Sequence, residues 1–217
     1  MILGKKLKGF ILIETAVALC VIGVLASIII PSVKTLISAS KILRTRHSLD
    51  FVLQSLSVHA KVYDRLPWPA TDNSGLENEC NHVIGKIPYK ALCIEEQVQK
   101  DGYQRDIIYI VNPILTTWIP KTPFDDKEIA FTKIQGPNNM HVVFEDGSPV
   151  LSCDAYAVAT DFCAVVLISI HPTSSYSLDD IVTLSGSDIK ITIPQKAPGV
   201  IVRWISRNNL FVLCGQF

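Results

Sequence analysis

Two hydrophobic patterns follow one another in the first 65 residues. Residues 10–30 form an apolar run in which Glu14 is the only charged residue. A helix of a soluble protein is rarely apolar around its whole circumference over such a length, and a bilayer core needs about 20 residues of helix. We therefore predict that residues 10–30 form a membrane-spanning helix.

Beyond this run, the apolar positions are spaced differently. They recur at intervals of three, four or seven with polar residues between them, at Leu36, Leu43, Leu49, Val52, Leu53, Leu56, Ala60 and Tyr63. This spacing predicts an amphipathic helix over residues 31–65 with one apolar stripe. Pro31 need not end the helix, because a proline in a long helix often produces only a kink. Pro67 and Pro69 forbid continuation.

Short apolar runs later in the chain predict strands after a loop-rich stretch at residues 70–104. The runs lie at residues 106–112, 128–134, 140–145, 163–170, 189–193, 200–205 and 210–214. The stretch 156–170 is ambiguous between strand and helix, and Asp146–Gly147 is a strong hairpin signal. We expect an α+β fold, in which the long N-terminal helix packs on an antiparallel β-sheet domain at residues 66–217.

The charges at the start of the chain predict an orientation in the membrane. Lys5, Lys6 and Lys8 precede the apolar run and no acid does, which places the N-terminus in the cytoplasm and the rest of the chain across the membrane. A conventional cleaved signal peptide would have a shorter apolar region that ends in a small-x-small site. Here the run ends in "ASIIIPSV", with bulky isoleucines around the candidate site.

The overall charge balance bears on the class of partner. The chain has 20 basic and 20 acidic residues among 217. Proteins that bind nucleic acid usually carry a basic surplus, so nucleic acid is not expected as the main partner.

Six cysteines occur, and five of them follow the predicted span. They lie on the side of the membrane where disulfides persist, and their odd number leaves at least one over. The shortest-loop pairings are Cys80 with Cys93 and Cys153 with Cys163, although a sequence does not fix connectivity. No zinc-type spacing of Cys and His is present, so neither a metal nor a cofactor is expected.

The stretch "KGFILIETAVALCVIGVLASIIIPSV" resembles the N-terminal signature of type IV pilins and of type II secretion pseudopilins. The basic leader of that family ends at Gly9 here, its acid falls on Glu14, and its proline falls on Pro31. The resemblance implies that a prepilin peptidase removes residues 1–9 by cutting between Gly9 and Phe10, and that the new amino group of Phe10 is methylated.

The resemblance also gives Glu14 a role. An ionised carboxylate at the centre of a span costs about 2.5–3.5 kcal/mol on insertion scales, and less near the membrane face, where Glu14 lies. The resemblance implies that Glu14 pairs with the Phe10 amine of a neighbouring subunit and so fixes the register of packed helices. The alternative is a carboxylate that is protonated or that reaches the lipid headgroups.

Together these features predict a structural subunit and not an enzyme. We expect an inner-membrane protein with a periplasmic globular domain, assembled into a type IV pilus or a type II secretion pseudopilus. The size of that domain favours a minor or accessory subunit. Its expected partners are the prepilin peptidase, other pilin or pseudopilin subunits through the N-terminal helix, the inner-membrane assembly platform and the lipid bilayer. The alternative is a single-pass, membrane-anchored periplasmic binding module that does not polymerise.

Other groups of polar residues carry weaker expectations. His171 has no identifiable Ser or Cys partner for hydrolysis, and the pair Asp179–Asp180 is better explained as the start of a helix or a turn than as a catalytic dyad. The acidic loop from Asp72 to Glu79 lacks the spacing of a calcium loop. We therefore name no catalytic residue.

Overall fold

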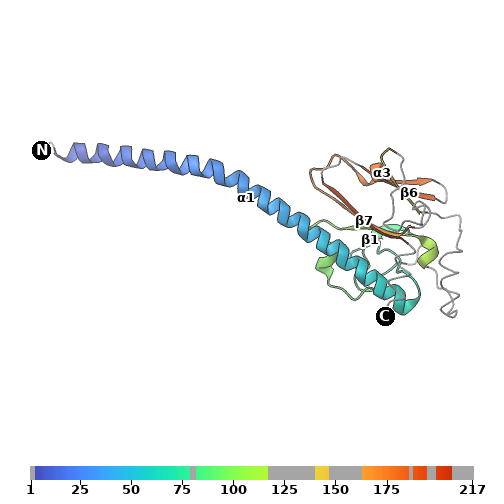
Figure 1. The fold of residues 1–217 in the computed structure, drawn as a ribbon. Helices are drawn as coiled ribbons and strands as arrows, with labels where there is room; N and C mark the ends of the chain where they lie inside the picture. Colours follow the sequence, from blue (N-terminus) through green and yellow to red (C-terminus); the bar gives the residue numbers. More distant parts are fainter. Residues whose placement is uncertain are drawn as a thin grey trace. The chain divides into compact units, whose positions relative to one another are not determined.

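The computed structural model describes residues 3–78, 82–116, 140–146, 163–185, 188–194 and 199–206. The chain divides into two compact units, Met1–Leu43 and Arg44–Phe217. The helix α1 (Leu3–Tyr63) contributes residues to both units, and Figure 1 shows it as the blue ribbon.

In the first unit, α1 runs through Pro31 without interruption, as the sequence predicted. Proline has no N–H to donate to the carbonyl of the preceding turn. Two hydroxyl groups just after Pro31 bond to carbonyls within the helix: Ser32 Oγ donates to Ile28 O at 3.2 Å, and Thr35 Oγ1 donates to Ser32 O at 2.7 Å. Such back-bonding keeps the side chains inside the helical geometry and often bends a helix.

The second unit is built around a four-stranded sheet in the order β1-β2-β4-β7. Its strands are β1 (Ile84–Lys86), β2 (Ile108–Val111), β4 (Cys163–Ile170) and β7 (Val200–Ser206). Every neighbouring pair is antiparallel. The stretch 156–170, which the sequence left ambiguous, is therefore a strand from Cys163 onward.

One face of this sheet is covered by the part of α1 from Leu49 to Ala60. Leu49, Val52 and Leu56 are fully buried. They belong to the same apolar cluster as Tyr109 of β2 and Leu167 of β4. The predicted packing of an amphipathic helix on an antiparallel sheet is therefore confirmed.

The predicted apolar stripe is nevertheless too long at both ends. Leu36, Leu43 and Tyr63 expose 69%, 64% and 54% of their surface. Leu36 and Leu43 lie in the first unit, and Tyr63 lies in the last turn of α1, where its ring stacks on His59. Spacing of apolar residues identifies a helix face, but it does not reveal where the covering element begins and ends.

The opposite face of the four-stranded sheet is covered by a second sheet in the order β3-β6-β5. Its strands are β3 (Met140–Phe144), β5 (Val182–Ser185) and β6 (Asp188–Ile193). Ile110 and Val166 of the first sheet share a cluster with Ile191 of the second. The second unit thus has three layers, helix, sheet and sheet (Figure 1). Because β4 is covered on both faces, its residues from Cys163 to Ile168 form an unbroken apolar run.

The second sheet is not fully antiparallel, which differs from the expectation for the domain. β3 pairs with β6 in parallel, and only β5 and β6 are antiparallel. Parallel neighbours need a long connection, and β4 lies between β3 and β6 in the chain. Local turn signals cannot reveal such a pairing.

The remaining elements are short. The helix α3 (Leu178–Ile181) begins with a capping box between Ser177 and Asp180, which confirms Asp179–Asp180 as a helix start. The 3-10 helices are η1 (Glu96–Gln99) and η2 (Pro113–Thr116). The predicted strands at 128–134 and 210–214, and Gly147 of the predicted turn, lie outside the described residues.

Candidate functional site

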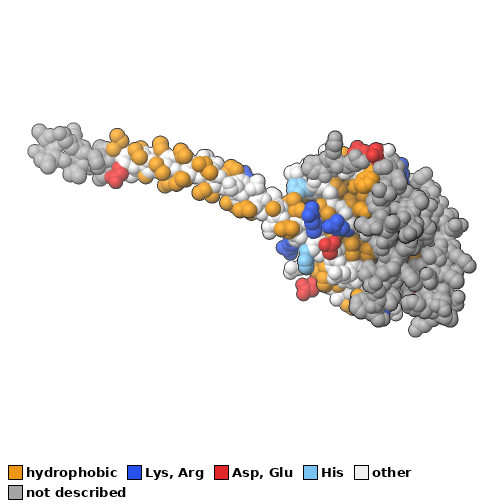
Figure 2. Space-filling model, in the orientation of Figure 1, with side chains coloured by type: hydrophobic (Ala, Val, Ile, Leu, Met, Phe, Trp, Pro, Cys, Tyr) orange, Lys and Arg blue, Asp and Glu red, His pale blue; other side chains and the backbone are white. Residues whose placement is uncertain are grey.

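The first candidate site is the apolar surface of α1 in the first unit. The exposed large apolar side chains from Ile13 to Leu43 show between 44% and 69% of their surface. Soluble monomers rarely expose contiguous apolar patches of more than a few hundred Å². Figure 2 shows hydrophobic side chains along the described part of this helix. Among the described residues, α1 is the one helix long and apolar enough to span a membrane.

The predicted processing residues lie at the start of this helix. Gly9 and Phe10 belong to the helical backbone of α1, and their side chains lie outside the described residues. Glu14 is exposed and sits four positions after Phe10, so the two residues lie about one turn apart on the same side of the helix. Cleavage after Gly9, methylation of Phe10 and the pairing of Glu14 stay predictions.

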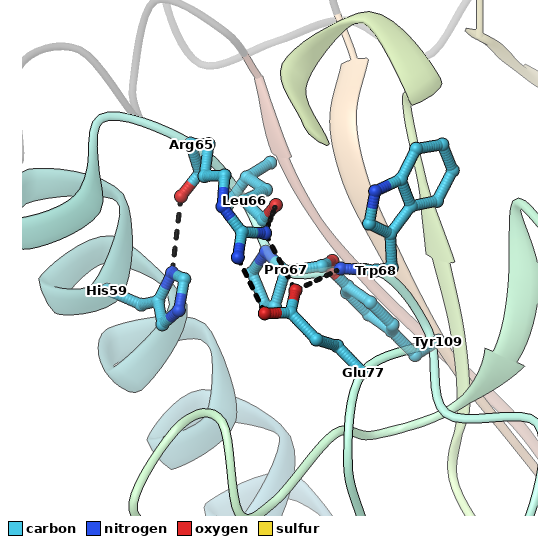
Figure 3. Close-up of polar contacts among 7 residues, drawn as sticks. All are labelled: His59, Arg65, Leu66, Pro67, Trp68, Glu77 and Tyr109. Carbon is cyan, nitrogen blue, oxygen red and sulfur yellow. Dashed lines mark hydrogen bonds and ion pairs between the residues drawn. The ribbon is translucent and has the colours of Figure 1, made fainter. Parts of the chain in front are cut away.

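The second candidate site is a group of polar contacts where α1 ends, here called the helix-end cluster. It consists of His59, Arg65, Trp68, Glu77 and Tyr109. Figure 3 shows these residues around the turn after α1, with the Trp68 ring pointing away from the Arg65–Glu77 contact. The Arg65 guanidinium donates to both oxygens of Glu77, at 2.7 and 2.6 Å. The backbone N–H of Trp68 also donates to Glu77, at 3.2 Å. Such paired contacts fix direction as well as distance.

Two further contacts complete the helix-end cluster. The buried His59 ring lies with Nδ1 at 3.2 Å from the Arg65 carbonyl, so Nδ1–H donates. The Tyr109 hydroxyl, fully buried, donates to the Pro67 carbonyl at 2.9 Å. Every polar atom named here points at a neighbour in the cluster or at the turn, which makes the cluster a structural fastening for the segment that leaves α1.

The environment of the helix-end cluster shifts the proton affinities of its members. Burial lowers the pKa of His59, and the charge of Arg65 adds to that effect. The hydrogen bond from Arg65 lowers the pKa of Glu77. Burial raises the pKa of Tyr109 well above its usual value. At neutral pH the cluster therefore holds a neutral imidazole beside an ionised Arg–Glu pair.

A second fastening joins α1 to the sheet near the start of the second unit. The buried Thr45 hydroxyl accepts the N–H of Gly102 at 2.9 Å. Next to it, Asp101 accepts N–H groups from Tyr103 and Arg105 through one oxygen, at 2.8 and 2.9 Å. Its other oxygen accepts the hydroxyl of Ser169 on β4, also at 2.9 Å. A buried carboxylate is tolerated when it is hydrogen-bonded in this way.

The other polar residues from the sequence form no catalytic arrangement in the part of the chain that the structure describes. His171 contacts Thr173 through Nδ1 and lies edge-on to Tyr103, with ring centres 4.2 Å apart. Asp72 accepts the Ser74 N–H in a local turn, and the hydrogen bonds from Ser74 lower its pKa. No group of three His, Cys, Asp or Glu among the described residues is placed to hold a metal ion.

The predicted disulfides are not decided by the structure. Cys93 is exposed, with a positive φ of 54°, and Cys163 is buried at the start of β4. Their expected partners, Cys80 and Cys153, lie outside the described residues. Both pairings therefore stay predictions.

The sequence predicted neither the helix-end cluster nor the contacts of Thr45 and Asp101. Arg65 and Glu77 are twelve residues apart, and Asp101 and Ser169 are 68 apart, so no spacing rule connects either pair.

Comparison with known proteins gives no further assignment, because no family model, curated protein or solved structure matches the chain. The family resemblance of the N-terminal segment thus rests on its own residues.

Proposed function

We propose that this protein is a prepilin-like structural subunit that is processed at its N-terminus and inserted into a type IV pilus or a type II secretion pseudopilus. The observation that carries the proposal is the exposed apolar surface of α1 from Ile13 onward, with Glu14 at its start. A lone helix with such a surface needs a bilayer or other apolar helices around it. A subunit that moves from a membrane into a fibre meets both.

The proposed orientation places the N-terminus in the cytoplasm and the second unit in the periplasm, with α1 crossing the inner membrane. Lys5, Lys6 and Lys8 support it, because basic residues are retained on the cytoplasmic side. The first proposed partner is then a prepilin peptidase, which would meet the Gly9–Phe10 bond at the cytoplasmic face. The inner-membrane assembly platform would act next.

Processing would change the electrostatics of Glu14. A cut after Gly9 makes Phe10 the first residue, so Glu14 would lie about one turn from the new N-terminus, near the positive end of the helix dipole. The new α-amino group of Phe10 supplies a positive charge at the same level. The amine of a neighbouring subunit would neutralise Glu14 when α1 leaves the lipid and packs against the helices of other subunits. Repeated head-to-tail contacts of this kind that do not close generate a fibre.

The alternative function is a single-pass, membrane-anchored binding module that keeps its N-terminus. It accounts for the apolar helix, but it gives no reason for a carboxylate five residues after Gly9 in an otherwise apolar run. The three-layered second unit, large for a repeated major subunit, favours a minor or accessory role within the assembly.

The test is mass spectrometry of the N-terminus of the full-length protein, purified from membranes of its host. We expect a chain that begins at Phe10 and carries one added methyl group on its amino nitrogen. A chain that retains Met1, or one cut after Ser27, would contradict the proposed function.

A further inference from the structure

The last two turns of α1 bury little apolar surface against the second unit. Leu56 is the final large apolar side chain of the helix that is fully buried. The large apolar side chains beyond it point outward and expose 61%, 63% and 54% of their surface, at Val58, Val62 and Tyr63. The buried residues beyond it are small or polar, namely Ser57, His59 and Ala60. His59 is therefore the largest buried side chain between Leu56 and the end of α1.

The stretch of residues 57–65 lies between two fixed points. On one side, Leu56 belongs to the apolar cluster between α1 and the sheet. On the other side, Leu66 is 1% exposed, and its N–H donates to the carbonyl of Leu115 at 2.7 Å. A segment with few buried apolar contacts opens at a lower cost in free energy than the core around it. This stretch can therefore open while the residues on either side stay in place.

His59 is the side chain that closes this stretch. Its Nδ1–H donates to the Arg65 carbonyl at 3.2 Å, and its ring packs on that of Tyr63 with ring centres 4.5 Å apart. The imidazole thus joins the end of α1 to the residue at which the chain turns away from the helix (Figure 3).

The surroundings of the His59 ring favour its neutral form. Among the described residues, the titratable and charged groups around it are Tyr63 on its own helix, Arg65 in the turn and Glu77 in the following loop. Burial has the largest effect and lowers the pKa of His59. The hydrogen bond to the Arg65 carbonyl and the charge of Glu77 raise this pKa, the charge of Arg65 lowers it, and the net change is a lowering.

Opening of the stretch would reverse this effect. Water then reaches the imidazole, and its pKa returns toward the usual value of about 6.5. The open form binds the proton more strongly than the closed form, so protons favour the open form as the pH falls below about 6.5.

We propose that residues 57–65, here called the latch, form an acid-operated conformational switch. At neutral pH the buried His59 holds the end of α1 on the second unit, and in acid the latch opens while the sheet stays folded. The Arg65–Glu77 contact and the buried Leu66 keep the chain attached beyond the latch. The surface that the second unit presents at the end of α1 then differs between neutral and acidic conditions. The inference does not depend on the proposed function.

The test is hydrogen–deuterium exchange of the full-length protein in detergent, measured by mass spectrometry at pH 7.5 and pH 5.5. Protection factors are compared, because the chemical exchange rate itself depends on pH. We expect the protection of the amides of residues 57–64 to fall about threefold or more at the lower pH. The upper limit is about tenfold, set by a pKa of about 6.5 in the open form. The amides of β4 should keep their protection.

Two histidine variants test whether His59 is the group that responds to acid. His59→Asn keeps an N–H donor near the position of Nδ1 but does not titrate, so the protection of residues 57–64 should become equal at the two pH values. His47→Gln is the matched control, because His47 is exposed on the same helix. This variant should retain the full dependence on pH.

Equal protection of the latch at the two pH values in the unmodified protein would overturn the inference, as would an equal loss of protection in β4. Both comparisons hold even if His59→Asn does not fold. A dependence on pH that persists in a folded His59→Asn protein would also overturn it. The result is separable from the proposed function, since a chain that begins at methylated Phe10 but keeps a protected latch at pH 5.5 would retain the function and refute the inference.

Discussion

Glu14 is the residue whose chemistry most directly distinguishes an assembly helix from a simple anchor. It is exposed on an apolar helix, and a charge in such a place is retained only where it finds a partner or a function. In a helix that serves only as an anchor, any side chain that is tolerated at this depth would suffice. In an assembling subunit the negative charge itself is needed.

Substitution at Glu14 should therefore separate processing from assembly. Glu14→Val is expected to leave the cut after Gly9 intact and to reduce incorporation into the fibre by about tenfold or more, the factor for losing roughly 1.4 kcal/mol of pairing. Immunoblots of sheared fibres and of whole membranes measure the two steps. Glu14→Gln keeps the size but not the charge, and normal incorporation of this variant would refute the pairing with the Phe10 amine.

The helix-end cluster gives the stability of the second unit a dependence on pH. The pKa of His59 is lowered in the folded protein, so the unfolded chain takes up that proton first as the pH falls below about 6.5. The free energy of unfolding should then decrease as the pH falls from 6.5 toward the folded pKa. Glu77, whose pKa is also lowered, adds a further loss at lower pH, below its unfolded value of about 4.3.

Variants of the cluster test this assignment in denaturant titrations of the full-length protein in detergent between pH 4 and 8. His59→Gln should flatten the part of the stability profile just below pH 6.5. Glu77→Gln should lower the free energy of unfolding by about 1 kcal/mol at pH 7, a value reduced by the partial exposure of the pair. An unchanged profile for His59→Gln would show that its proton is not coupled to folding.

At the scale of the element, α1 changes character along its length although it is one helix. Up to Ile30 it presents apolar residues on all sides, and in the second unit it presents one buried stripe, with Leu49, Val52 and Leu56 fully enclosed. The hydrogen bond from Gly102 to Thr45 and the helix-end cluster fasten the two ends of that second part. The same backbone thus serves two different environments.

Two apolar residues of α1, two positions apart, make this difference measurable. Leu56 is fully buried and Val58 is 61% exposed. Leu56→Ala should lower the free energy of unfolding by about 2–5 kcal/mol, because a cavity is left against the sheet. Val58→Ala should change it by less than about 0.5 kcal/mol. Comparable losses from chemical denaturation of the two variants would contradict the assignment of the buried face.

At the scale of the whole molecule, the two units are suited to different solvents. The buried residues that the structure describes all lie in the second unit, beginning with Thr45. The described side chains of the first unit supply no buried residue to that core. We therefore expect the second unit to be the part that unfolds cooperatively, and the first unit to be the part that requires a membrane.

Truncation tests this division. A chain that lacks residues 1–32 should move from the membrane fraction to the soluble fraction and keep its cooperative thermal unfolding, within a few degrees of the full-length protein in detergent. Centrifugation and far-ultraviolet circular dichroism measure the two properties. A matched chain that lacks residues 1–52 removes Leu49 and Val52 as well and should lose cooperative unfolding. Persistence of the transition in this chain would show that α1 is not part of the core.

The features that could be predicted from the sequence are those whose pattern lies within residues close together in the chain. The apolar run of residues 10–30, the passage through Pro31, the central strand Cys163–Ile170 and the helix start at Asp179–Asp180 were all confirmed as structure. Each depends on neighbours within a few residues. The role of Glu14 and the cut at Gly9–Phe10 come from a sequence signature and stay predictions.

Only the tertiary structure decided which surfaces meet. It limited the buried stripe to the part of α1 that has a sheet beside it, and it paired β3 with β6 in parallel. It also brought Arg65 to Glu77 and Asp101 to Ser169 across long separations in sequence. The spacing of apolar residues indicates that one face of a helix or strand must be covered, because that face is removed from water in every fold. The identity of the covering element depends on contacts that form only when distant segments fold together.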